Sequence, residues 1–326
     1  GALPKQMGNP DLKWQRTLNN NFGLTAAFLD SRFNLSFDFY SNTTYDMLMS
    51  VNLPPSVGTT SMNVNFGQLN NKGLDLSLSA QIIRNKDWFW SVTLTGGHVM
   101  DQIRKISEGL KNDIDNPYDS SKPKILFVEG GSQYDIYAMR SAGIDPATGK
   151  EIFIKKNGEY TFNYDEKERV AVGNTNPILQ GSLMNTLRYK GFSISVATSY
   201  TFGSDYFNST LKNKVENIDL NYNVDRRVFT DRWKEPGDHT RFLGIGTSSS
   251  SSQYSERFVE KRNELYISSI QVMYDFAPKA ITRLGLRKLA IGFGLSDIAH
   301  ISTVKFERGT DYPYCRGINL IFRPTF

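Results

Sequence analysis

Apolar and polar residues alternate with a period of two along much of this chain. Between Arg32 and Phe39 every second residue is Phe or Leu, and the residues between them are Arg, Asn, Ser and Asp. That period is typical of a β-strand with one apolar face. A similar alternation runs from Leu18 to Phe28, and only residues 29–31 separate the two segments. The pattern therefore predicts two antiparallel strands joined by a short turn.

The same hairpin design recurs three times further along the chain, and a single strand follows the last hairpin. Each of these hairpins has a short connection between its strands. The connections lie at residues 84–87, at Lys190-Gly191 and around Pro278. The alternation predicts nine strands, at residues 17–28, 32–42, 68–82, 88–100, 179–189, 192–203, 263–277, 287–298 and 315–326.

The segments between the hairpins are long and polar. They are rich in Asn, Asp, Ser, Gly and Pro and cover residues 41–66, 101–178, 204–262 and 299–313. The longest contains a small hairpin signal, Glu151 to Phe162, around Asn157-Gly158. Short turns on one side of the strands and long loops on the other are typical of an outer-membrane β-barrel. The alternative is a soluble β-sandwich, which has turns about every 8 to 12 residues and no such asymmetry.

We therefore predict an all-β, transmembrane antiparallel β-barrel with long extracellular loops. The residues expected to face lipid share one parity within their strands: Phe37, Leu76, Trp90, Val92, Ile194 and Ile291. Nine is an odd number of strands, whereas bacterial single-chain barrels have an even number, and open sheet edges in lipid cost several kcal/mol for each unpaired backbone group. Residues 1–326 are thus expected to be one domain, the carboxy-terminal part of a larger barrel, and not to close a barrel alone.

Composition and charge narrow the alternatives. The 38 basic and 33 acidic residues leave a net charge of only +5 without a Lys/Arg-rich run, so nucleic acid is not an expected partner. A single cysteine, Cys315, rules out an internal disulfide framework. No stretch approaches the roughly 18 consecutive apolar residues of a membrane helix, so a membrane would have to be crossed by strands.

Seven phrases in the chain carry a family resemblance. They are Gly8–Gln15 (GNPDLKWQ), Tyr45–Leu48 (YDML), Asn70–Leu76 (NNKGLDL), Ala142–Gly149 (AGIDPATG), Val172–Pro177 (VGNTNP), Tyr189–Ser195 (YKGFSIS) and Asp231–Thr240 (DRWKEPGDHT). Each phrase alone is a weak match, but in this order they closely resemble the carboxy-terminal part of SusC/RagA-like TonB-dependent outer-membrane transporters.

The resemblance implies a protein of the bacterial outer membrane that actively imports nutrient oligomers, glycan or peptide fragments. It implies a barrel of about 22 strands with an amino-terminal plug inside, a SusD-like surface lipoprotein over the mouth, and energy coupling by the TonB complex. No plug-like segment precedes Gly1 in this sequence, so the plug, the amino-terminal strands and the TonB contact are expected outside it. Pro324 interrupts the final strand, which departs from the usual family ending.

Catalytic chemistry is not indicated. His98, His239 and His300 have no metal-ligand spacing, and the chain contains no HExxH, GxSxG or P-loop motif. We predict no enzyme activity and no cofactor.

A group of Asn and Asp side chains in one extracellular loop offers oxygen ligands that could hold Ca²⁺. A solvated acidic loop is favoured instead, because the Gly and Glu of an EF-hand are missing. These residues are Asn112, Asp113, Asp115, Asn116 and Asp119.

Loop aromatics are the candidates for ligand contact, because flat rings with a polar edge can cover sugars or peptide side chains. They are Tyr118, Tyr134, Tyr137, Tyr206 and Trp233. Asp231 and Arg232, beside Trp233, add hydrogen-bonding groups suited to a polar oligomer. The alternative is that these aromatics pack the loops together. That alternative is favoured for Trp233, which leaves Tyr134 and Tyr137 as the better candidates for direct contact.

Two other functions remain open from the sequence. A passive porin would keep its uptake without a proton-motive force, and a structural or adhesive surface barrel would bind partners without transport.

Overall fold

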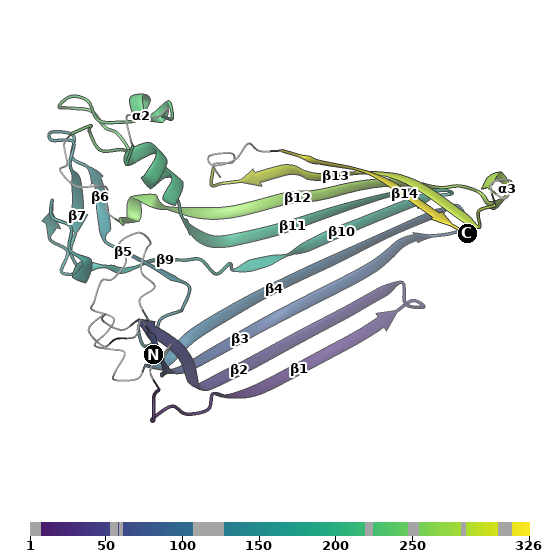
Figure 1. Ribbon diagram of the computed structural model, residues 1–326, viewed down its shortest axis with the longest axis horizontal. Helices are drawn as coiled ribbons and strands as arrows, with labels where there is room; N and C mark the ends of the chain where they lie inside the picture. The colour runs from purple at the N-terminus through teal and green to yellow at the C-terminus, as the bar shows by residue number, and fades with distance from the viewer. Residues whose placement is uncertain are drawn as a thin grey trace, which may run out of the picture.

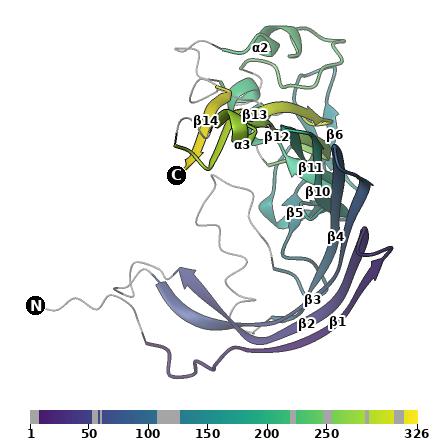
Figure 2. The ribbon, with the colours of Figure 1, turned by 90° about the vertical axis from the view of Figure 1, so that its right-hand side faces the viewer.

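Long antiparallel strands dominate the computed structural model, which describes residues 8–52, 58, 61–106, 127–218, 224–246, 254–281, 285–305 and 315–326. In these residues nine strands form one curved sheet, called the wall below, in the order β1-β2-β3-β4-β10-β11-β12-β13-β14 (Figures 1 and 2). The strands are β1 Arg16–Phe28, β2 Phe33–Asn52, β3 Ser61–Arg84, β4 Trp88–Ile106, β10 Leu179–Tyr189, β11 Phe192–Phe207, β12 Val259–Asp275, β13 Lys288–Ser302 and β14 Gly317–Thr325.

The wall confirms the predicted fold class, because each predicted strand is present and each pairs with the next one in the sheet. Within the described chain β1 and β14 each have one neighbour only, so the sheet is open at both edges. The regular pairing follows from the strict alternation, since a shift by one residue would place every apolar side chain on the polar face.

The strands on the long-loop side run further than the sequence predicted. β2 continues to Asn52, β3 begins at Ser61 and β4 continues to Ile106, so the expectation of a loop over most of residues 41–66 was wrong. Irregular pairing near Thr44 and Met47 breaks the alternation that would have revealed these extensions. A buried apolar cluster stabilises them: Phe66, Leu69, Ile103 and Ile106, with Met47, Met49, Met62 and Val64 packed against it.

The two faces of the wall differ in chemistry. One cross-strand row joins small hydroxyl residues on five strands: Ser36, Ser77, Thr95, Ser182 and Ser199. Paired residues share a face, and the neighbouring row, offset by one residue, contains Phe37 and Leu76. The face that carries Phe37 and Leu76 is apolar. The same register places the other four predicted lipid-facing residues on it: Trp90, Val92, Ile194 and Ile291. In a barrel the apolar face meets lipid, so the hydroxyl face lines the lumen.

The short turns lie together at one end of the wall, which is the right-hand end in Figure 1. The turn between β1 and β2 places Leu29, Asp30 and Ser31 in the left-handed backbone region, with φ of 51°, 54° and 61°. The β12–β13 connection holds the short helix α3, Pro278–Ile281. None of the helices in the described ranges is both long and apolar enough to cross a membrane.

The opposite end carries a folded region, called the head below, made of the described parts of residues 127–178 and 208–258 (Figure 1). Its strands are β5 Asp135–Ala138, β6 Arg140–Ile144, β7 Glu151–Ile154, β8 Tyr160–Thr161 and β9 Val170–Asn174. Its helical turns are η2 Glu166–Glu168, η3 Leu211–Glu216, α2 Arg227–Thr230 and η4 Glu256–Phe258. β7 and β8 pair as the hairpin that Asn157-Gly158 predicts, with Gly158 at a φ of +90°.

Candidate functional site

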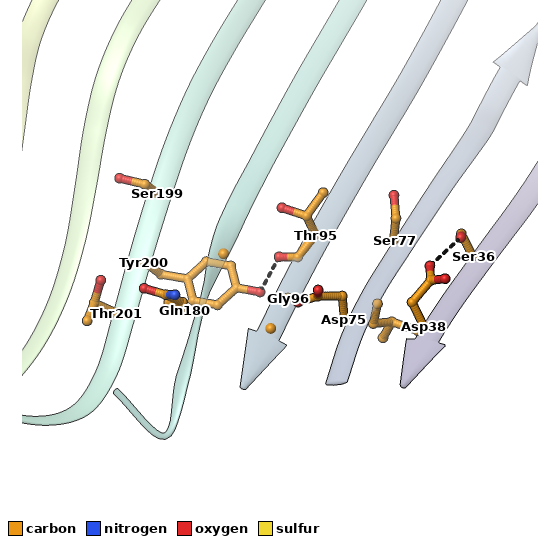
Figure 3. A pocket seen from close by; sticks show the side chains of 13 residues that line it. Ser36, Asp38, Asp75, Ser77, Thr95, Gly96, Gln180, Ser199, Tyr200 and Thr201 are labelled. Atoms are coloured by element: carbon orange, nitrogen blue, oxygen red, sulfur yellow. Dashed lines mark hydrogen bonds between the residues drawn. The ribbon is translucent and has the colours of Figure 1, made fainter. Parts of the chain in front are cut away.

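The lumen face of the wall carries a groove of about 540 Å³, called the wall groove below (Figure 3). It crosses β2, β3, β4, β10 and β11, and its side chains are mostly short and polar. The polar residues that line it are Ser36, Asp38, Asp75, Ser77, Thr95, Gln180, Ser199 and Thr201. Hydroxyl, amide and carboxylate groups suit hydrogen bonding to a polar or cationic partner.

Two glycines make room for the two carboxylates. Asp38 pairs across the sheet with Gly23 on one side and Asp75 on the other, and Asp75 pairs with Gly97. A Cβ atom on Gly23 would lie 2.6 Å from the Asp38 Oδ1, and one on Gly97 would lie 2.5 Å from the Asp75 Oδ1. The carboxylates therefore lean apart over glycine backbone, each toward a different neighbouring strand.

Tyr200 joins β11 to β4 beside the groove, and by register it belongs to the apolar row of Gly181, Gly96 and Leu76, not to the lumen face. Its hydroxyl donates to the Thr95 carbonyl oxygen at 2.6 Å (Figure 3). A Cβ atom on Gly181 would lie 2.6 Å from that hydroxyl, so only glycine lets the side chain pass over β10 to β4. Nothing in the sequence indicated this bond.

In the head, Trp233 joins two of the seven phrases. Its indole Nε1 donates to the Pro146 carbonyl oxygen at 2.9 Å, and the Gly237 N–H donates to the same oxygen at 2.9 Å. The ring lies against Gly149, whose φ of +69° and missing Cβ both suit the contact. These are the loop-packing contacts that the sequence favoured, and a ligand role for Trp233 stays a prediction.

Arg232 and Asp231 point to different places. The Arg232 guanidinium is buried and donates to the carbonyl oxygens of Val215 and Glu216, at 2.6 and 2.7 Å. It thereby satisfies the end of η3, where helical carbonyls lack partners. Asp231 is exposed and accepts from the Thr230 hydroxyl at 2.7 Å. The structure does not bring these two side chains together, so their shared ligand contact also stays a prediction.

Tyr134 and Tyr137 differ in access. The Tyr134 side chain is 43% exposed, while its carbonyl oxygen accepts from the Thr175 N–H at 2.9 Å. Tyr137 is only 7% exposed, and burial together with the nearby Asp135 carboxylate raises the pKa of its phenol. Tyr134 is thus the tyrosine that a ligand reaches without loop movement, and contact by either one stays a prediction.

Other predicted loop candidates lie elsewhere. Tyr118 and the Asn112–Asp119 group fall outside the described residues. Tyr206 lies near the end of β11. Within the described ranges, no three His, Cys, Asp or Glu side chains are placed to hold a metal ion.

The VGNTNP phrase anchors the head to the wall. The Asn174 N–H donates to the Asp205 Oδ2 at 2.9 Å, and its side-chain amide donates to the Asp135 Oδ1 at 2.8 Å. Asn176 donates to the Val99 carbonyl oxygen on β4 at 2.5 Å. The phrase therefore fixes where the head sits over β4 and β11.

A buried ion cluster, which the sequence did not reveal, holds the head together. Arg257 donates to the Glu151 Oε2 at 2.8 Å and to both carboxylate oxygens of Glu216 at 2.8 and 2.9 Å. The three side chains are 8%, 4% and 1% exposed, respectively. Burial alone would lower the pKa of the Arg257 guanidinium, but the bonds to Glu151 and Glu216 outweigh it and raise that pKa. Long sequence separation hides the cluster.

Comparison with known proteins identifies the family. A family model described as TonB dependent receptor-like, beta-barrel matches residues 2–218. TonB-dependent receptor P39 of Formosa agariphila is 26% identical over an alignment of 344 residues, gaps included. The alignment covers 91% of this chain and 33% of the relative. TonB-dependent receptor SusC of Bacteroides thetaiotaomicron is 26% identical over 82% of this chain and 27% of its own length.

A solved structure, described as that of the RagAB peptide transporter, shares the fold with a TM-score of 0.76 and 23% sequence identity. The match covers 91% of this chain and 33% of that chain. The chain thus spans about a third of the length of these relatives. The proteins of this family are outer-membrane proteins, which confirms the predicted location. Because the family model covers more than half of the sequence, the chain belongs to the TonB dependent receptor-like β-barrel family.

Proposed function

We propose that this chain is the wall and head of an active importer that carries nutrient oligomers, glycan or peptide fragments, across the outer membrane. The observation that carries the proposal is the family match over residues 2–218. The wall supports it physically, because an apolar face and a hydroxyl-lined face on the same strands suit a protein that lies in lipid and encloses a polar path.

The proposal extends to partners. A plug segment of the full-length receptor would fill the lumen, a SusD-like surface lipoprotein would cover the head, and the TonB complex would supply energy through parts outside this chain. The relative named SusC and the fold shared with the RagAB peptide transporter support this arrangement. An oligosaccharide or oligopeptide is the proposed ligand, with Tyr134 exposed on the head for contact.

Energy dependence of uptake tests this function. Cells that express the full-length receptor would be given labelled oligosaccharides and oligopeptides, with and without collapse of the proton-motive force. Active import predicts that uptake falls to background on collapse and in cells without the coupling protein. Uptake that persists would indicate a passive porin, and surface binding without uptake would indicate an adhesive barrel.

Replacing both head tyrosines tests the ligand contact. Tyr134→Ala with Tyr137→Ala should reduce uptake several-fold, because aromatic stacking contributes on the order of 1 kcal/mol for each ring. Tyr160→Ala is the matched control, since Tyr160 is 71% exposed on β8 and lies outside the predicted site. Unchanged uptake in a correctly assembled double variant would remove both tyrosines from the site.

A further inference from the structure

Two adjoining turns, at the right-hand end of the wall in Figure 1, carry four exposed cations. Arg84 ends β3 and Lys86 lies in the β3–β4 turn, while Arg188 and Lys190 belong to the β10–β11 hairpin. The two turns are in contact, because the Lys190 N–H donates to the Asp87 carbonyl oxygen at 2.8 Å. Asp87 is the single acidic residue in residues 84–87 and 188–191, so the two turns together carry an excess of positive charge.

Ion pairing sets these cations apart from those at the loop end of the wall. There, the Arg16 guanidinium lies 3.0 Å from the Asp46 carboxylate, and the Lys261 ammonium lies 2.7 Å from the Asp205 carboxylate. In the described part of the chain none of the four turn cations forms an ion pair. The turn end therefore presents positive charge to its surroundings.

A row of aromatic residues marks the level of these turns in the membrane. Trp88 and Tyr189 are paired across β4 and β10 on the apolar face of the wall, and their ring centroids lie 4.2 Å apart. Phe192 and Tyr274 continue the row on β11 and β12, with centroids 4.5 Å apart. Aromatic rows at the ends of barrel strands lie at the membrane–water interface. The turn cations, which follow next along the chain, therefore lie at the level of the lipid phosphates.

The Lys190 side chain lies at the border between the apolar face and water. Its Nζ atom lies 5.2 Å from the centroid of the Tyr189 ring, whose face attracts a cation. The Arg188 guanidinium lies on the opposite face of the sheet, 5.0 Å from the centroid of the Phe89 ring, so it adds positive charge without facing lipid. Lys190, and Lys86 in the adjoining turn, are thus the two cations placed to meet a lipid headgroup.

An anionic phospholipid combines the two chemical groups that suit this place. Its phosphate accepts charge-assisted hydrogen bonds from ammonium groups, and lysine binds phosphate as a compact charge. Its acyl chains are apolar and pack on lipid-facing aromatic rings. The short turns of outer-membrane barrels face the periplasm, so the lipid belongs to the periplasmic leaflet. A free phosphate ion would contact the lysines alone.

We infer that Lys86 and Lys190, together with the Trp88–Tyr189 pair, form a binding site for one anionic phospholipid of the periplasmic leaflet. The two lysines bind the phosphate, and the aromatic pair packs against the acyl chains. The inference goes beyond the proposed import, because it depends only on the outer-membrane location and on the contacts of the two turns. Failure of the lipid site would leave the proposed function untouched.

The lipid affinity of the purified full-length receptor tests the site. The receptor would be titrated in neutral detergent with phosphatidylglycerol, and in parallel with phosphatidylcholine of the same acyl chains, and native mass spectrometry would count the bound lipid. The variant Lys86→Gln with Lys190→Gln removes both charges. Its affinity for phosphatidylglycerol should fall about 25-fold, because each basic residue near an anionic lipid surface contributes about a factor of five. Its affinity for phosphatidylcholine should not change.

Three variants serve as controls, and heat-modifiable migration would check the assembly of each. Lys279→Gln with Arg287→Gln removes two exposed cations from the β12–β13 connection at the same end of the wall, and should change the affinity less than about twofold. Asp87→Asn removes the one carboxylate of the two turns and should tighten phosphatidylglycerol binding about fivefold. Lys86→Arg with Lys190→Arg keeps the charge and should retain binding.

Four outcomes would overturn the inference. Unchanged phosphatidylglycerol affinity in an assembled Gln variant would show that the lysines do not bind the lipid. Equal losses in that variant and in the β12–β13 control would show that the overall charge of the turn end attracts the lipid. Equal affinity of the wild-type receptor for both lipids would show that the headgroup charge plays no part. Excess inorganic phosphate should leave the lipid bound, and displacement would show that the lysines take a soluble anion instead.

Discussion

The wall and the head of this protein bury their apolar side chains in different ways. In the head, Leu211, Val215, Val228, Phe242 and Phe258 form a buried cluster of their own. In the wall, apolar residues such as Leu320 and Phe22 are 81% and 64% exposed in the chain alone. Regular backbone pairing fixes the wall, while lipid supplies the partner for its apolar face. The head is therefore expected to behave as a small globular domain and the wall as a structure that depends on its membrane.

Removal of the ion cluster in the head tests whether the two regions are separate. Arg257→Ala leaves the carboxylates of Glu151 and Glu216 buried without a cation, which should cost about 3 to 5 kcal/mol. Hydrogen exchange of the full-length receptor should show lost protection in β7 and η3 and unchanged protection in the wall strands.

Arg241→Ala provides the matched control for that experiment. The Arg241–Glu260 pair is 2.7 Å long, but the arginine side chain is 46% exposed, so its loss should cost about 0 to 1 kcal/mol. If Arg257→Ala causes equal loss of protection in the wall and the head, the two regions unfold as one unit. That result would contradict the view that the head is a separate globular domain.

Arginine substitutions on β4 test the two faces of the wall. Val92→Arg places a charge on the apolar face and should cost about 2 to 4 kcal/mol near the middle of the membrane, whereas Thr93→Arg on the lumen face should cost little. The Thr93 hydroxyl oxygen lies 3.3 Å from that of Ser79 on this face. Denaturant unfolding of the full-length receptor in lipid vesicles would measure both. Equal destabilisation would reverse or abolish the assignment of faces.

The Trp233 contact tests how the head is locked. Trp233→Ala removes the packing on Gly149 and the bond to the Pro146 carbonyl oxygen, with an expected cost of about 2 kcal/mol. Protease treatment of intact cells should then cut the head faster while the barrel stays assembled. Trp14→Ala is the control, because Trp14 is 87% exposed and its loss should cost less than about 0.5 kcal/mol. Equal cleavage rates in the two variants would remove the locking role.

The sequence predicted the wall far better than the head, and the reason is local. A strand shows its facing in every second residue, so nine strands could be placed from the pattern alone. The wall extensions were missed where pairing becomes irregular and Gly67 has a φ of +145°. Arg257 lies 106 residues from Glu151 and 41 from Glu216, and no local pattern marks such a cluster.

The candidate sites, like the ion cluster, depend on contacts between residues that are distant in sequence. The wall groove depends on Gly23 and Gly97 lying beside Asp38 and Asp75, which only the register of the sheet reveals. Trp233 was expected to pack the loops, but neither the seven phrases nor the periodicity indicated that its ring lies against Gly149. What is repeated along the strand could be predicted, and what depends on contacts between distant loops could not.

The smallest predicted effect is a gain in stability at the β1–β2 turn, in the wall. Asp30 has a φ of 54°, a left-handed conformation that costs a non-glycine residue about 1 kcal/mol. Its side chain is exposed, so Asp30→Gly removes few contacts. Glycine relieves the strain of the positive φ but also raises the entropy of the unfolded chain, and the net stabilisation of the full-length receptor should be about 0.5 kcal/mol. Asp87→Gly in the β3–β4 turn is the control, because Asp87 is not among the residues with positive φ and should lose stability on the same substitution. The two denaturation midpoints should therefore move in opposite directions, and a shift in the same direction would show that the left-handed turn is not strained.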